Sequence, residues 1–518
     1  MRNPENYPSE DPVIVGGRRL RLHEVCEVAR GAPLMLEHGA AFRQRIQHGA
    51  DLLAEYIAAG KPVYGVTTGY GDSCTVTVPH EIIEQLPAHL VRYHGCGLGA
   101  YFDEPTSIAI LVTRLNSLAT GFSGVRLEVL TQLEALIRHR IAPLIPEEGS
   151  VGASGDLTPL SYVAAAMMGE REVRYQHRQC SAAEALQVAG LTPLTLKPKE
   201  GLALMNGTSV MTALACLAWE RAEYLMRLAT RITSLASIAL GSNAKHFAPG
   251  LFAVKPHVGQ QQVAAWIFAD MGASARESPM RIQDRYSIRC APHVIGVLAD
   301  ALGWMQRDIE NELNSANDNP IIDPDSGEIY HGGHFYGGHI AFVADSLKNA
   351  VANIADLLDR QLALLVDTRF NNGLPSNLSG ATEERASLNH GFKAVQIAVS
   401  AWTAEALKLT MPASVFSRST ECHNQDKVSM GTIAARDVLR VLELSEQVAA
   451  ACLAAATQAM EIRRRRHNRP PAHMSATLDA MLEDVLGVCA FVEEDRPLDN
   501  ELRKLCTAVK QRRWALYG

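Results

Sequence analysis

The sequence lacks the features that mark secreted, membrane-spanning or disulfide-stapled chains. Its ten cysteines include no C-x-x-C pair, so reduced thiols are expected rather than a disulfide framework. The most apolar late segment, Val448 to Met460, is shorter than the roughly 18 residues that favour a membrane span. The N-terminus has no apolar run behind a charged start, which is typical of a chain without a leader peptide. We therefore predict a cytoplasmic protein with reduced thiols.

The sequence also has no large excess of charge of either sign. The 518 residues carry 49 basic and 56 acidic side chains, a net charge of −7, and no long basic run. The one short cluster, Arg463 to Arg466, is interpreted as a solvated helix end. Without a basic stripe, neither nucleic acid nor an anionic membrane surface is predicted as a partner.

Aromatic residues make up only 6% of the chain, whereas alanine and leucine are abundant, and this balance favours helices over strands. Five long segments, almost free of proline and glycine, have apolar residues at three- and four-residue spacing: Met211 to Leu240, Ala291 to Glu312, Ile340 to Val366, His390 to Thr410 and Gly431 to Ile462. We predict a mainly α fold with a long-helix bundle at 211–518. Because Ala-rich helices this long pack closely, contacts between subunits are expected.

The first part of the chain, 1–210, is expected to form a smaller mixed domain with many glycine turns. Short runs rich in β-branched residues predict strands at Val13 to Val15, Pro62 to Thr67 and Cys74 to Val78, and Ile108 to Thr120 has helical spacing.

The loop GSVGASGDLTPL, Gly149 to Leu160, has the sharpest local pattern. The structural interpretation is a glycine-rich connection before a helix capped by Asp156. It is neither a phosphate loop, since no Gly-Lys-Ser/Thr follows, nor a G-x-S-x-G nucleophile elbow. A tightly bent Ala-Ser-Gly can instead close a five-membered ring when the Gly155 nitrogen attacks the Ala153 carbonyl carbon. Loss of water, including the Ser154 hydroxyl, then leaves an electrophilic methylidene.

This loop resembles the signature of the aromatic amino acid ammonia-lyase and aminomutase family. Members carry a methylidene-imidazolone group, MIO, formed autocatalytically from the tripeptide that corresponds to Ala153, Ser154 and Gly155, and need no external cofactor. Six further blocks resemble the family in the same order: VYGVTTGYG (63–71), GLALMNGTSVMT (201–212), QDRYSIRC (283–290), NSANDNPII (314–322), HGGHFYGG (331–338) and HNQDKVSMG (423–431). The resemblance implies a homotetramer in which each site gathers residues from three subunits.

The resemblance also implies roles for single residues. Tyr64, which alone would be interpreted as a half-buried strand tyrosine, corresponds to the general base that takes the β-proton from the substrate. A phenol titrates near 10, so nearby positive charge or amide dipoles would have to favour its phenolate. Asn206 corresponds to the residue that hydrogen-bonds the MIO oxygen. Arg289 corresponds to the carboxylate clamp, a task that suits the guanidinium fork.

Other matched positions line the implied site. Gln283 and Tyr286 would orient the substrate beside the MIO, Phe335 matches an aromatic residue close to it, and Asn319 is a supporting residue. The family usually has asparagine at the position of His334, which is a departure. The histidines His331, His334 and His339 lack a carboxylate or cysteine to complete a ligand set, so no metal is predicted.

Three residues bear on the substrate. Tyr93 and His94 occupy the family's selectivity positions, and a histidine there indicates a substrate ring with a polar far end. Histidine lyases generally carry glutamate where this chain has Gln425, and a neutral amide suits a neutral ring. The expected substrates are therefore tyrosine, then phenylalanine, then histidine.

The predicted function is the non-oxidative elimination of ammonia to give an arylacrylate, coumarate or cinnamate. Three alternatives stay open: a tyrosine or phenylalanine 2,3-aminomutase, a histidine ammonia-lyase that forms urocanate, and a non-catalytic helical scaffold.

Overall fold

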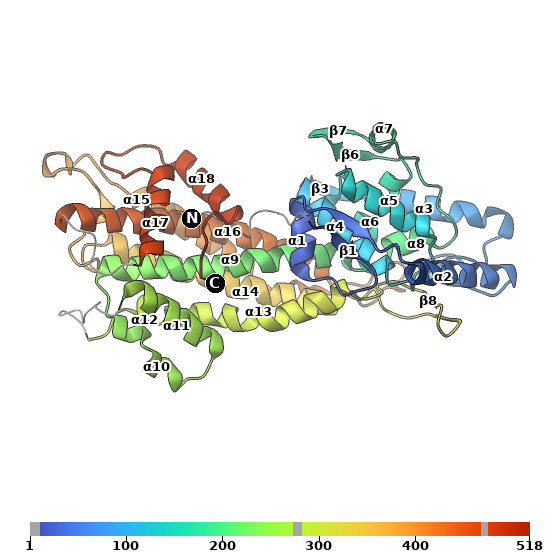
Figure 1. Cartoon of the computed structure of the whole chain (residues 1–518), viewed down its shortest axis with the longest axis horizontal. Coiled ribbons are helices and arrows are strands. Elements are labelled where there is room, and N and C mark those ends of the chain that lie inside the picture. Colours follow the sequence, from blue (N-terminus) through green and yellow to red (C-terminus); the bar gives the residue numbers. More distant parts are fainter. Residues whose placement is uncertain (1–10, 273–281, 468–474, 518) are drawn as a thin grey trace.

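Long parallel and antiparallel helices run along most of the length of the molecule (Figure 1). The computed structural model describes residues 11–272, 282–467 and 475–517. The longest helices are α9 (Ser209–Leu240), α13 (Ala291–Leu313), α14 (Gly338–Val366), α15 (Lys393–Lys408) and α16 (Gly431–His467). They correspond to the five segments predicted from apolar spacing, and the predicted mainly α fold is confirmed.

The centre of the bundle consists of α9, α14 and α16, which pack against one another, while α13 lies beside α9 and α14. In α16 the alanine-rich stretch from Val448 to Ala456 is buried throughout. Small side chains let the three backbones approach closely, so this stretch forms a core helix and not a surface one. The remaining helices of this end are α10 (Pro249–Ala253), α11 (Val258–Met271), α12 (Tyr286–Arg289), α17 (Ala476–Val488) and α18 (Asp499–Lys510).

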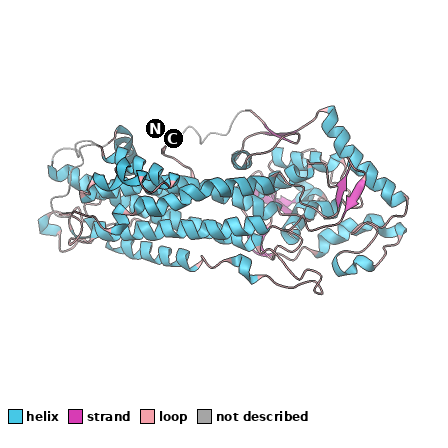
Figure 2. Ribbon diagram, turned by 90° about the horizontal axis from the view of Figure 1, so that it is seen from below, coloured by secondary structure: helices cyan, strands magenta, loops and turns pink. Residues whose placement is uncertain are grey.

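The N-terminal third forms shorter helices and small sheets at the other end of the molecule (Figures 1 and 2). Its helices are α1 (Leu22–Arg30), α2 (Ala40–Ala58), α3 (Leu86–Tyr93), α4 (Glu104–Leu118), α5 (Leu127–Arg138), α6 (Leu157–Met167), α7 (Ala182–Val188) and α8 (Glu200–Met205). The strands are β1 (Val13–Val15), β2 (Leu34–Leu36), β3 (Leu98–Tyr101), β4 (Ala142–Pro143), β5 (Pro146–Glu148), β6 (Glu172–Tyr175) and β7 (Arg178–Ser181), with β8 (Ile321–Asp323) and β9 (Glu328–Tyr330) from later in the chain. The domain boundary near residue 210 stays a prediction.

Two predicted strands are wrong. The segment Pro62 to Thr67 is mostly a turn, and the segment Cys74 to Val78 begins inside the 3-10 helix Gly71–Thr75. An isolated bridge joins Thr77 to Thr68, the residue after the first segment. The β-branched valines of the first segment are buried for another reason. Val63 and Val66 are buried in a small separate core with Leu52, Leu53 and Ile322, which anchors the turn without a ladder partner.

Two further expectations also need correction. Asp156 precedes α6 but makes no cap hydrogen bond to it; its carboxylate instead accepts the N–H groups of Val210 and Met211 at the start of α9. The basic cluster at the end of α16 is not simply solvated, because Arg463 donates to the carbonyls of Ala239 and Asn371. Among the residues described, no helix combines the length and apolar character that crossing a membrane requires.

Candidate active site

A cavity of about 1070 Å³ lies at the end of the molecule that holds α3, α6 and α8. It gathers most of the residues that the sequence motifs single out, from segments far apart in the chain. The predicted site residues on its wall are Tyr64, Tyr93, His94, Ala153, Ser154, Asn206, Asn319, Phe335 and Gln425. Gly155 lies directly beside them in the loop but is itself buried.

The Ala153–Gly155 loop has a left-handed backbone at two successive residues. Ser154 has φ +49° and Gly155 φ +78°, a region that L residues other than glycine rarely adopt. A Cβ atom on Gly155 would lie 2.1 Å from the Gly207 carbonyl oxygen, so only glycine fits there. The Gly207 N–H donates to the Ser154 carbonyl at 3.2 Å, and the Asp156 N–H donates to the Gly207 carbonyl at 2.7 Å. These bonds clamp the loop against the segment that follows α8.

Two buried charged side chains, those of Asp156 and Arg114, support the segments that these hydrogen bonds join. Asp156 accepts the two α9 amides and the Thr432 hydroxyl, yet complete burial raises its pKa to about 6. Arg114, also fully buried, lies behind Gly207 and donates to the carbonyls of Ala203 and Asn317. Burial lowers the pKa of Arg114 to about 10, which leaves the guanidinium charged at neutral pH.

Tyr64 points its phenol at the start of the Gly71–Thr75 helix, where the Gly71 N–H donates to the phenolic oxygen at 2.8 Å. Burial raises the pKa of Tyr64, the Gly71 hydrogen bond lowers it, and the nearby Glu421 carboxylate raises it again, with a net upward shift. The Gly71 N–H thus favours the phenolate form of Tyr64, and burial and the Glu421 carboxylate oppose it.

The cavity wall also carries polar aromatic groups. The rings of Tyr93 and His94 are in contact, with centroids 4.3 Å apart. His94 Nδ1 lies 3.0 Å from the Leu90 carbonyl oxygen, and burial lowers the pKa of this imidazole. Gln425 Nε2 donates to the Ser154 hydroxyl oxygen at 3.1 Å, which places a neutral amide against the tripeptide.

Asn206 lies at the floor, 2% exposed, at the C-terminal end of α8. Its amide nitrogen donates to Asp318 Oδ1 at 3.3 Å and to the Asn319 carbonyl at 2.9 Å, and its amide oxygen is buried without a partner in the described structure. The nitrogen is thus already engaged by Asp318 and Asn319, and the expected hydrogen bond to an MIO oxygen stays a prediction.

Gln283, Tyr286 and Arg289 are not brought to this cavity within one chain. They belong to α12 and the turn before it, toward the opposite end of the helix bundle from α6 and α8 (Figure 1). Arg289 lies with its guanidinium carbon 4.7 Å from the centre of the Tyr286 ring, and Tyr286 is 72% exposed. These residues can act at such a cavity only if a second copy supplies them.

The structure places at or below the cavity three groups to which the sequence analysis gave no role in the site; His331 was considered only as a metal ligand. Glu421 accepts the Asp72 N–H with both carboxylate oxygens, at 3.0 and 3.1 Å, next to the amide that holds Tyr64. His331 Nε2 accepts the backbone N–H of Tyr64 at 3.4 Å. Lys199 forms a fully buried ion pair with Asp318. Glu421 lies two residues before a quoted motif, and Lys199 lies two residues before another, so extending the motif boundaries would have included them.

The sequence model of the family described as aromatic amino acid lyase matches residues 20–485. The chain belongs to this family. A curated histidine ammonia-lyase from Caldanaerobacter subterraneus subsp. tengcongensis is 38% identical over 455 residues, which span 87% of this chain and 88% of that protein. The protein is therefore an enzyme, a carbon–nitrogen lyase.

Two solved structures share the fold. The phenylalanine aminomutase of Pantoea agglomerans superposes with a TM-score of 0.90 at 31% identity, covering 96% of this chain and 99% of that chain. The tyrosine aminomutase of Streptomyces globisporus superposes with a TM-score of 0.89 at 33% identity, covering 97% of both chains. The family relationship predicted from the motifs is confirmed; the tyrosine preference is not, because the curated relatives carry the name of the histidine enzyme.

Proposed function

We propose that this lyase eliminates ammonia from an L-amino acid whose aromatic ring carries a hydrogen-bond donor, with histidine as the first candidate and tyrosine as the second. The orientation of His94 is the main support. A carbonyl oxygen can only accept, so His94 Nδ1 donates to Leu90 and the neutral ring presents Nε2 as an acceptor. An imidazole N–H or a phenol O–H satisfies this acceptor, whereas the unsubstituted ring of phenylalanine leaves it unpaired.

The order of the two substrates depends on two observations that point in different directions. The curated relatives named histidine ammonia-lyase favour histidine. Gln425, whose neutral amide donates a hydrogen bond to Ser154, favours an uncharged ring and thus tyrosine. Because the relatives match over nearly the whole chain and Gln425 is a single position, histidine is placed first.

The tripeptide fits the MIO group that the family carries. Ser154 and Gly155 already have the left-handed backbone of a tight turn, and the Gly207 contact leaves no room for any side chain at position 155. When formed, MIO supplies an electrophile for the substrate amine, which ordinary side chains do not provide. Tyr64 then takes the β-proton at its phenolic oxygen, and Gln425 and Asn206 position the groups around the loop.

A second copy of the chain is proposed to complete the site. Arg289 and Tyr286 lie far from the cavity in one chain, whereas a cation near Tyr64 would favour its phenolate and the substrate carboxylate needs a cation to bind. Large apolar side chains on the bundle are exposed in the single chain, among them Val297, Phe342 and Ile397. Such surfaces are typical of subunit interfaces, in agreement with the tetramer implied by the family.

A substrate panel tests the proposed function. The purified protein is incubated separately with L-histidine, L-tyrosine and L-phenylalanine, and ammonia, arylacrylate and β-amino acid are quantified. We expect ammonia and urocanate in equal amounts from histidine, or ammonia and coumarate from tyrosine. A β-amino acid as the main product would support the aminomutase alternative. No product from any of the three would overturn the proposal.

Replacing His94 by leucine is expected to lower kcat/KM for the preferred substrate by about 10- to 100-fold, because its ring donor loses a buried partner. Activity with phenylalanine should stay within about threefold of the unmodified enzyme, since its ring forms no bond with His94. Steady-state kinetics with all three amino acids measure this effect. Equal losses of kcat/KM for all three amino acids would show that His94 does not distinguish their rings.

Co-expression of two inactive variants tests whether the site is shared. Tyr64→Phe and Arg289→Ala are each expected to be nearly inactive alone. If Tyr64 and Arg289 of one site come from different chains, random mixed tetramers should recover about one quarter of the activity, since each site needs two intact contributions. As a control, Tyr64→Phe mixed with Ser154→Ala should recover none, because both residues line the same cavity of one chain. Failure of the first mixture to recover activity would contradict the shared site.

A further inference from the structure

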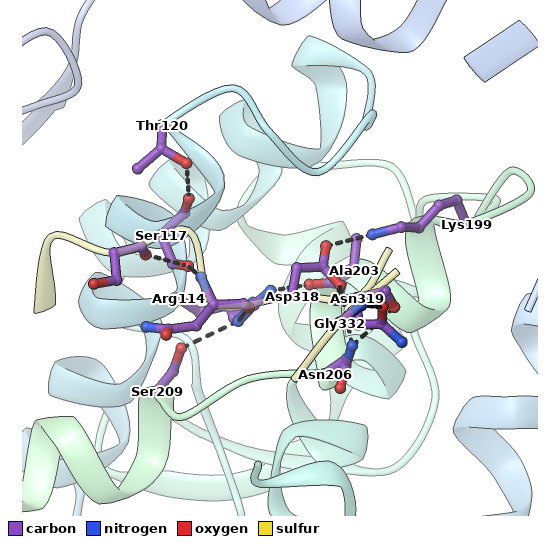
Figure 3. A network of polar contacts seen from close by, with 12 residues as sticks. Arg114, Ser117, Thr120, Lys199, Ala203, Asn206, Ser209, Asp318, Asn319 and Gly332 are labelled. Atoms are coloured by element: carbon purple, nitrogen blue, oxygen red, sulfur yellow. Dashed lines mark hydrogen bonds and ion pairs between the residues drawn. The ribbon is translucent and has the colours of Figure 1, made fainter. Parts of the chain in front are cut away.

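One buried carboxylate below the cavity, that of Asp318, binds the residues at both ends of α8 (Figure 3). Lys199 immediately precedes α8 and Asn206 immediately follows it. The Lys199 ammonium and the Asn206 amide nitrogen both donate to Asp318, Lys199 to Oδ2 and Asn206 to Oδ1. Lys199 and Asp318 are each fully buried. The helix is thus attached at both ends to the same buried group.

Two acceptors, Asp318 Oδ1 and the Asn319 carbonyl, determine how the Asn206 amide can lie. An ionised carboxylate only accepts hydrogen bonds, and the Asn319 carbonyl likewise only accepts. Both partners of Asn206 on this side are acceptors, at 3.3 and 2.9 Å, so the amide nitrogen must face them. The amide oxygen is then fixed on the other side, where it is buried and has no partner in the described structure (Figure 3).

The Lys199 ammonium is the counter-ion that this buried carboxylate requires. If Asp318 no longer accepted, the Asn206 amide nitrogen would keep only the Asn319 carbonyl as a partner, so one hydrogen bond would hold the amide in place of two. Asp318 also accepts the Asn319 N–H at 2.7 Å, and Asn319 Oδ1 accepts the Gly332 N–H at 2.9 Å, so the same group orders the neighbouring cavity residues.

The backbone at Lys199 indicates that the pair is more than incidental packing. Its φ is +76°, a conformation that costs free energy for a residue with a Cβ atom. Strained residues of this kind persist where the surrounding contacts require them, and here the requirement is a side chain directed inward to Asp318.

We propose that Lys199 and Asp318 are positioning residues that act through Asn206, by holding its amide in a single orientation beside the Ala153–Gly155 loop. The proposal rests on the proposed function, because it assigns Asn206 to the working site. It identifies two residues for the reaction that lie behind the cavity wall and that the motif roles leave unassigned.

A double-mutant cycle tests the proposal. Asp318→Asn, Lys199→Met, Asn206→Ala and the pairs with Asn206→Ala are compared in kcat, normalised to the fraction of chains that show the mass deficit of MIO. Asp318→Asn and Lys199→Met are expected to lower kcat by about 10- to 100-fold, the effect of a misplaced group. In the Asn206→Ala background either change should have less than about a threefold effect, because the residue through which it acts is gone. If the effects multiply in the double variants, the proposal is wrong.

Glu200→Gln provides the matched control. Glu200 is the next residue on α8, is also buried, and pairs with Arg126 at 2.7 Å without contacting Asn206. This variant should lower the thermal unfolding midpoint yet leave normalised kcat within about threefold of the unmodified enzyme. In the cycle, its effect on kcat should be the same with and without Asn206→Ala. If Glu200→Gln shows the same coupling to Asn206 as Asp318→Asn, the effect is general loosening of α8 and the proposal fails.

Binding separates this proposal from the proposed function. The same cycle is measured on the dissociation constant for urocanate or coumarate by calorimetry, which requires no turnover. If the intact enzyme releases no ammonia but the binding cycle shows coupling, the proposed function fails and the positioning role stands. If ammonia is released and the binding and kinetic cycles are both multiplicative, the positioning role fails and the function stands. Should Lys199→Met not fold, the Lys199→Met/Asp318→Asn pair, which buries no net charge, replaces it.

Discussion

Replacing Ser154 by alanine is expected to reduce ammonia release on the order of 10³-fold or more, because the electrophile cannot form without the serine hydroxyl. The hydroxyl is the leaving group of the second dehydration, and its oxygen accepts the Gln425 amide at 3.1 Å. Ring closure and dehydration remove two waters, so the unmodified chain should weigh about 36 Da less than its sequence mass. The Ser154→Ala variant should not lose both waters, because it has no serine hydroxyl to eliminate.

Intact-mass spectrometry and a kinetic assay on the same preparation check both statements. Ser161→Ala, a serine on α6 whose hydroxyl bonds the Thr158 carbonyl, serves as the control and should keep both the deficit and the activity. An unmodified chain with its full sequence mass, or a Ser154→Ala variant with undiminished activity, would rule out the MIO mechanism.

Tyr64→Phe is expected to lower kcat by about 10²- to 10⁴-fold, the usual contribution of a general base, with a smaller change in KM. The substitution removes the phenolic oxygen that lies 2.8 Å from the Gly71 nitrogen and leaves the ring in place. Tyr56→Phe is the matched control, since its hydroxyl bonds the Gly327 carbonyl on the outer side of the same small core. Near-normal kcat in Tyr64→Phe would assign proton removal to another group.

The pH profile gives a second measurement of the same base. If Tyr64 is the base that we propose, it acts as a phenolate, so kcat/KM should rise with pH until the phenol is ionised and then level off. In one chain, burial and Glu421 shift the pKa of Tyr64 upward, whereas a cation from the proposed second copy would shift it downward. Under the proposed shared site, weakening the contacts between copies should therefore move the rising limb to higher pH, and Tyr64→Phe should abolish it. A limb that is unchanged in Tyr64→Phe would belong to a different residue.

Much of the fold was predictable because it depends on periodic burial. The five long helices have apolar residues at three- and four-residue spacing, and the structure places each of them within a few residues of the predicted bounds. The segment around Tyr64 was mispredicted as a strand for a physical reason. Val63 and Val66 are both buried, but as anchors of a turn on α2 and β8, and a short apolar run does not reveal whether it has a ladder partner.

The candidate site was likewise predictable from the sequence only in part. By itself, the sequence determined the family and the residue types around the loop, and it indicated Ala153, Ser154 and Gly155 as the proposed MIO precursor, because ring closure would depend on the identities of these three residues. Only the tertiary structure decided that Tyr64, His94, Asn206 and Gln425 share one cavity, and that Arg289 and Tyr286 lie at the far end of the bundle. It alone revealed the Lys199–Asp318 pair, which joins residues 119 positions apart. Contacts between distant segments leave no local periodicity in the sequence, so folding had to bring them together before they could be recognised.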